Sequence, residues 1–222
     1  MDYLQQGIKQ VEQEDYEAAA QSFQQAIEEQ PDDPVGYINF GNLLLHFGDA
    51  QRAERFFKRA LELDSRSATA CYSLGNLYFE LEKFHQAIPY FANAIEFQLD
   101  EADVYFMLGL SWRNSGEAVK ALPYLLRATE LNAVDQESHL QYGLALAEAD
   151  QLEQAANAFQ TVIKLNAEHS DAYYNLAIAR LFQEQTEVAI EHLQTAVKIN
   201  PDHDLAKQTL EQVTALLEQI ED

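Results

Sequence analysis

The residues in this sequence best suited to chemistry are six histidines and a single cysteine, Cys71. Two histidines four residues apart on a helix could bind a metal ion, and an activated thiolate could act as a nucleophile. No two histidines have this spacing; they are His46, His85, His139, His169, His192 and His203. We therefore interpret the histidines as surface or packing residues and Cys71 as a small core residue.

Larger catalytic motifs are missing as well. The sequence contains no glycine-rich phosphate loop, no dinucleotide-binding loop, no H-E-x-x-H and no paired C-x-x-C. We predict that the chain is not an enzyme and uses no cofactor or metal. One cysteine allows no intramolecular disulfide, and the first residues show neither a basic nor an apolar signal segment, so we expect a cytoplasmic location.

The charge balance restricts the partners. With 37 acidic and 14 basic residues the chain carries a net charge of −23, which repels nucleic-acid phosphates and anionic lipid headgroups. We therefore expect no binding to nucleic acid or to membranes. Residues 34–67 are the only segment with a positive balance, and their cations gather between Arg52 and Arg59. This basic segment is either a solvated face that pairs with the acidic residues 1–33 or a second docking surface.

The elements that would position any binding residues are set by an internal repeat. The pattern A-x3-F/L-x2-A, with one valine at its last position, recurs at intervals of 34 residues and starts at Ala19, Ala53, Ala87, Ala121, Ala155 and Ala189. A small residue keeps the same period at Gly7, Gly41, Gly75, Gly109, Gly143 and Ala177. Six copies in one register predict six consecutive helical hairpins.

These spacings resemble the tetratricopeptide repeat, whose pattern is W-x2-L-G-x2-Y followed by A-x3-F, A and P. The resemblance covers residues 1–203 and implies an all-α, right-handed superhelical solenoid of antiparallel hairpins. As a single array it divides into repeats at 1–33, 34–67, 68–101, 102–135, 136–169 and 170–203. Residues 204–222 follow as a C-terminal capping helix, with apolar residues at helical spacing from Leu205 to Ile220.

Helix packing explains why the same residue spacing recurs in every repeat. A small residue on the first helix of each hairpin, helix A, lets the second helix, helix B, approach closely. Polar or glycine residues such as Gly48-Asp49 form the turn between them, and Pro31, Pro34 and Pro201 lie between hairpins. We place Pro89 and Pro123 near the start of helix B, where a missing N–H costs least.

In the family, helix A lines the groove of the superhelix, and positions 2, 5, 6, 9, 12 and 13 of each repeat face the ligand. Carried over by position, the resemblance implies a peptide-binding set made of Ile38, Asn39, Asn42, His46, Tyr72, Asn76, Phe79, Phe106, Leu110, Arg113, Tyr174, Asn175 and Ile178. An asparagine carboxamide can pair with both the N–H and the C=O of a peptide backbone. The aromatic residues are either anchors for the ligand or packing residues between helices.

A carboxylate clamp of the kind found in some family members needs lysine and arginine on helix A. The matching positions hold Ile38, Thr69, Ser73, Asp103 and Met107, so a C-terminal carboxylate would lack a cation. We predict a non-catalytic scaffold or adaptor for a neutral to basic, partly apolar peptide or helix of a partner protein. The alternatives are a chaperone or assembly factor for a client, and an array that self-associates weakly through Leu4, Ile8 and Val11 at its N-terminal end.

Overall fold

A computed structural model describes residues 2–221 of the chain and the side chains of residues 2–218. Within these residues the chain forms thirteen helices and no strand. Their bounds are α1 (Tyr3–Glu12), α2 (Tyr16–Glu29), α3 (Pro34–His46), α4 (Ala50–Leu63), α5 (Ala68–Glu80), α6 (Phe84–Glu96), α7 (Ala102–Asn114), α8 (Ala118–Leu131), α9 (Gln136–Glu148), α10 (Leu152–Leu165), α11 (Ser170–Phe182), α12 (Thr186–Ile199) and α13 (Asp204–Glu221).

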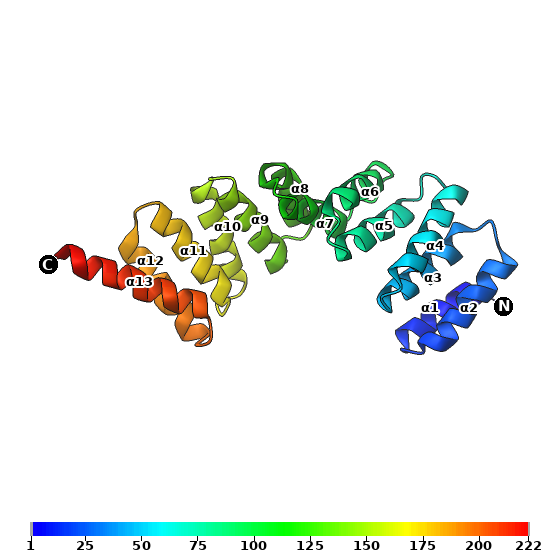
Figure 1. The fold of residues 1–222 in the computed structure, drawn as a ribbon, viewed down its shortest axis with the longest axis horizontal. Coiled ribbons are helices and arrows are strands. Elements are labelled where there is room, and N and C mark those ends of the chain that lie inside the picture. The colour runs from blue at the N-terminus through cyan, green and yellow to red at the C-terminus, as the bar shows by residue number, and fades with distance from the viewer. Residues whose placement is uncertain (1, 222) are drawn as a thin grey trace. The chain divides into compact units, whose positions relative to one another are not determined.

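Consecutive helices pair as hairpins, so that α1 packs on α2, α3 on α4 and α5 on α6 (Figure 1). Within residues 1–111 these hairpins also contact one another, through α2 with α3 and through α4 with α5. Contacts group the chain into two compact units, residues 1–111 and 112–222, with the boundary inside α7. The second unit shows the same pairing in α9 with α10 and α11 with α12. The all-α hairpin fold expected from the 34-residue period is confirmed.

Close contact between glycine and phenylalanine holds the first three hairpins together. A Cβ atom added at Gly7, Gly41 or Gly75 would lie 2.5 Å from Cε1 of the phenylalanine sixteen residues later on helix B. These phenylalanines, Phe23, Phe57 and Phe91, are at most 1% exposed. The glycine therefore leaves room for a ring that fills the space between the two helices, as the repeat pattern predicts.

The turn inside each hairpin ends helix A in the same way six times. A backbone N–H bonds to the carbonyl five residues earlier at 2.8–3.0 Å, and the residue before this N–H has a positive φ. That residue is glycine only at Gly48 and Gly116; the other four are Glu14, Glu82, Asp150 and Glu184. A side chain in this left-handed conformation crowds the backbone, so these four turns carry local strain.

Replacing Glu184 by glycine should therefore raise the free energy of unfolding by about 0.5–1 kcal/mol. The φ of Glu184 is 60° and its side chain is exposed, so the change removes strain without removing packing. Urea denaturation followed by circular dichroism measures the effect. Glu191→Gly, an exposed position inside α12, is the matched control and should destabilise by about 1 kcal/mol. Equal losses in both variants would contradict the assignment of strain to the turn.

The two helix-B prolines are not where the sequence pattern placed them. Pro89 is the sixth residue of α6 and Pro123 the sixth residue of α8. Only the first four N–H groups of a helix lack an internal partner, so each proline removes a hydrogen bond that the helix would otherwise make. The expectation that the missing N–H costs least here was wrong, although both proline side chains are exposed.

The last described helix, α13, packs on α12. Ala206 is fully buried in a cluster with Ala177, Leu193 and Ala196, and Leu210 packs against this cluster. Leu205 and Leu216 are 58% and 59% exposed, whereas the side chain of Ile220 lies outside the described residues. No helix in the described part of the chain is long and apolar enough to cross a membrane.

Cys71 lies on α5 and is 2% exposed. Burial is the main cause that raises the pKa of its thiol to about 11, and the nearby Asp64 carboxylate adds to this effect. The thiolate is therefore scarce at neutral pH, which fits the interpretation of Cys71 as a core residue.

Candidate functional site

An apolar cleft lies between the first helices of the first two hairpins. Its volume is about 360 Å³, and we call it the α1–α3 cleft. The lining residues are Ile8, Val11, Glu12, Tyr16, Phe23, Asn39, Asn42, Leu43 and His46. Three residues that the sequence assigned to peptide binding, Asn39, Asn42 and His46, thus share one concavity with aliphatic and aromatic side chains. Such a mixture suits a partner with an apolar side chain and a free backbone.

The four predicted asparagines differ in what their amides already bind. Asn39 Nδ2 donates to the Val35 carbonyl at 2.9 Å, and Asn175 Nδ2 donates to the Asp171 carbonyl at 2.8 Å. Asn76 hydrogen-bonds the Tyr72 hydroxyl; this bond opposes the rise in the pKa of Tyr72 that burial causes. Asn42 is exposed and forms no side-chain hydrogen bond with any described residue. It is therefore the asparagine best able to pair with a ligand backbone.

Six lining residues of the α1–α3 cleft were not assigned to peptide binding from the sequence, and three of them, Ile8, Val11 and Glu12, lie on α1. They lie 34 residues before Asn42, Leu45 and His46, at the same positions of the first repeat. Applying the register of the second repeat to the first would have identified all three. Ile8 and Val11 were instead assigned to self-association.

At the fifth position of the repeat, Ile38 and Leu140 are core residues. Ile38 is 4% exposed and clusters with Ala60 and Ala70, so a ligand cannot reach its side chain. Leu140, three repeats later by position, is 7% exposed in the core of the second unit. The ring of Tyr72 lies 5.8 Å from that of Phe91. The assignment of Ile38 to the binding face is therefore corrected, because this position faces the next hairpin.

The remaining apolar residues of the predicted set are half-buried. They are Phe79, Phe106, Leu110 and Ile178. The Phe79 ring lies 5.2 Å from that of Phe84 in an edge-to-face arrangement, so it packs within its own hairpin. None of the four lines the α1–α3 cleft.

Arg113 is bound within the second unit. Its Nε and Nη2 donate to Oε1 of Glu148 at 3.0 and 2.7 Å, and its Nη1 donates to Oε1 of Gln141 at 2.5 Å. Gln141 in turn donates to Glu137 at 2.7 Å. The guanidinium thus joins α7 to α9 and is already paired, so it is not a free cation for a ligand carboxylate.

Tyr174, the last aromatic residue of the predicted set, packs at the start of the C-terminal helix. Its ring lies 5.0 Å from that of His203, whose Nδ1 accepts the Ala206 N–H at 3.3 Å. Nε2 of His203 lies 3.1 Å from Oδ1 of Asp171, although without hydrogen-bond geometry. Tyr174 therefore contributes to the packing of α13 and offers little free surface.

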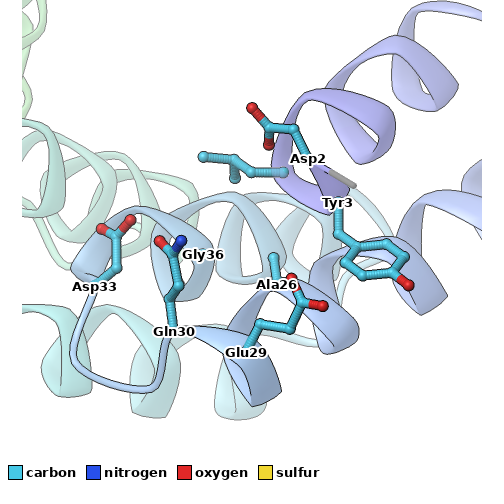
Figure 2. A pocket seen from close by; sticks show the side chains of 8 residues that line it. Asp2, Tyr3, Ala26, Glu29, Gln30, Asp33 and Gly36 are labelled. Carbon is cyan, nitrogen blue, oxygen red and sulfur yellow. The ribbon is translucent and has the colours of Figure 1, made fainter.

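A second cleft in the first unit is polar. Figure 2 shows Asp2 at the start of α1 and Glu29, Gln30 and Asp33 around the turn from α2 to α3. This acid-lined cleft has a volume of about 370 Å³. Asp2 and Asp33 each use Oδ1 to accept a backbone N–H at the start of a helix, from Gln5 and Val35 respectively. Among the described residues no group of three histidine, cysteine or acidic side chains could hold a metal ion.

Several solved structures are similar to this chain. YrrB, a TPR protein, shares 39% identity over 86% of this chain and 99% of its own, with a TM-score of 0.83. MamA shares 21% identity over 76% of this chain and 92% of its own, with a TM-score of 0.72. Pseudomonas aeruginosa PilF shares 16% identity over 95% of both chains, with a TM-score of 0.77. The last two show likeness of fold alone. No curated protein matches the chain.

Consecutive hairpins with an amide-rimmed apolar cleft on their first helices define a helical-repeat protein of the type that generally mediates protein–protein interaction. The family model for the tetratricopeptide repeat matches residues 4–68, 72–135 and 140–204. The chain belongs to the tetratricopeptide repeat family, as the sequence pattern indicated.

Proposed function

We propose that the protein holds a segment of a partner protein against helix A of its hairpins, with the α1–α3 cleft as the anchoring point. The observation that carries this proposal is the combination of Ile8, Val11 and Tyr16 with the unpaired amide of Asn42 in one concavity. An apolar side chain of the partner would enter the cleft, and its backbone would pair with the amide. YrrB, the similar TPR protein, is described as having an unusual peptide-binding site.

The chemistry of the cleft favours a neutral to basic, partly apolar segment. Glu12 and His46 are its titratable groups, apart from the Tyr16 hydroxyl, and residues 2–33 carry nine acids against Lys9. A basic residue next to the apolar anchor would meet this negative field, whereas an acidic one would be repelled. Arg113 is paired with Glu148, so the second unit adds no free cation at that position.

Asn42→Ala should weaken binding of such a segment about three- to tenfold, the loss expected for one hydrogen bond pair. Val11→Glu, which adds a charge to the apolar lining, should weaken it about tenfold or more. Peptides selected on the intact protein from a random displayed library, with affinity measured by calorimetry, provide the test. Asn93→Ala is the matched control, because Asn93 is an exposed asparagine on helix B of the same unit. Peptides that bind all four proteins equally would contradict the cleft as the site.

A further inference from the structure

The outer face of α4 carries a basic surface that the proposed function does not use. Arg52, Arg55 and Arg59 are exposed and lie three and four residues apart, so they share one face of the helix. Arg55 and Arg59 also line a shallow cleft of about 220 Å³ with Tyr37 and Phe56. We call these five residues the α4 surface.

The aromatic part of the α4 surface is held in place by its neighbours. The Phe56 ring lies 4.9 Å from that of Phe40 and 6.1 Å from that of Tyr37. The Tyr37 hydroxyl donates to the Pro31 carbonyl at 3.0 Å. A docking partner would therefore meet a preformed apolar base, and little side-chain ordering would be needed on binding.

The arginines of the α4 surface have few carboxylate partners. Arg55 donates through Nε to the Gln51 carbonyl at 3.3 Å and has no ion pair with any described residue. Arg59 pairs with Glu62 at 2.9 Å, and Arg52 with Asp49 at 3.4 Å, both within the same local segment. Like charges four residues apart on a helix repel each other, so Arg55 and Arg59 would gain from an added anion. No ion pair joins this surface to residues 2–33.

The first hairpin of the same chain has an excess of acidic residues without basic partners. Its nine acids are opposed by Lys9 alone, and none of them forms an ion pair with a described residue. The carboxylates of Glu28, Glu29 and Asp32 are exposed at the end of α2 and in the turn that follows it. Glu29 also lines the acid-lined cleft (Figure 2). The guanidinium group binds carboxylates in a planar, two-pronged geometry, which makes these acids a suitable counterpart for Arg55 and Arg59.

We propose that the α4 surface of one copy docks on the acidic first hairpin of a second copy, with Arg55 and Arg59 facing the carboxylates around Glu28 and Glu29. The two surfaces lie on different helices of each molecule, so two copies can exchange both contacts across a two-fold axis or associate head-to-tail from copy to copy. The net charge of −23 opposes association over long distances. At physiological salt, charges act over only about 8 Å, so the local pairing decides the outcome.

Sedimentation velocity over a concentration series tests the proposal on the intact chain, at about 0.15 M and at about 1 M salt. The weight-average mass should rise with concentration at about 0.15 M salt, where the long-range repulsion is screened, and the protein should stay monomeric at about 1 M salt, where the local ion pairs are screened as well. Arg55→Glu with Arg59→Glu should abolish the rise. Lys164→Glu with Lys198→Glu, two exposed lysines of the second unit without ion pairs among the described residues, is the control with the same change in net charge. This control should still associate.

Charge exchange distinguishes a direct contact from a general effect of charge. Glu28→Lys with Glu29→Lys should also stay monomeric alone, and mixing it with the Arg55→Glu, Arg59→Glu variant should restore association. A wild-type protein that stays monomeric at every concentration and salt would overturn the proposal. So would association that persists in the Arg55→Glu, Arg59→Glu variant, because another surface would then be responsible.

Discussion

Phe91→Ala should lower the free energy of unfolding by about 3–5 kcal/mol, a large fraction of the stability of an ordinary domain. The Phe91 side chain is 0% exposed and fills the hollow that Gly75 leaves between α5 and α6. Removing the ring takes its apolar area out of the core and leaves a cavity that two rigid helices cannot close. The loss also spreads to the neighbouring hairpins, because each hairpin of a repeat protein is stabilised by the ones it touches.

Urea denaturation of the full chain, followed by far-ultraviolet circular dichroism, measures this loss. Phe182→Ala is the matched control, because Phe182 lies on α11 with 73% of its side chain exposed. That change should alter the stability by less than about 0.5 kcal/mol. A similar small loss for Phe91→Ala would show that the ring does not hold the hairpin together.

Gly75→Ala should lower the free energy of unfolding by about 1–3 kcal/mol, although alanine normally stabilises a helix relative to glycine by about 1 kcal/mol. The sign reverses because the new Cβ would lie 2.5 Å from Cε1 of Phe91 and 2.6 Å from its Cδ1. The ring is fully buried and has no space to move into, so the two helices must separate.

The same contact predicts a rescue. In the sixth hairpin the equivalent positions hold Ala177 and Leu193, both fully buried in one cluster. Phe91→Leu should therefore reduce the cost of Gly75→Ala, and the double variant should be more stable than the sum of the two single losses by about 0.5–3 kcal/mol. A double-mutant cycle in urea measures this coupling. Strict additivity would mean that residues 75 and 91 do not compete for the same space.

Some of the candidate binding residues line the cleft, whereas Ile38 is buried in the core. Asn39, Asn42 and His46 were placed on helix A by the repeat register, and the structure brings them together in one cleft. Ile38 comes from the same register, yet it is buried, because whether a side chain meets the solvent or the next hairpin depends on the packing angle between hairpins. The packing angle between hairpins cannot be derived from the spacing of residues in a single sequence.

The sequence by itself determined the period of 34 residues, the helical hairpins and the pairing of a small residue on helix A with a large one on helix B. These properties depend on residues a fixed distance apart, and a repeated pattern displays them directly. Only the tertiary structure decided that Arg113 is paired with Glu148, 35 residues away, that four turns place an acidic residue at a positive φ, and that Arg55 is left without a carboxylate. Each of these depends on which side chains meet in space and on how the backbone turns.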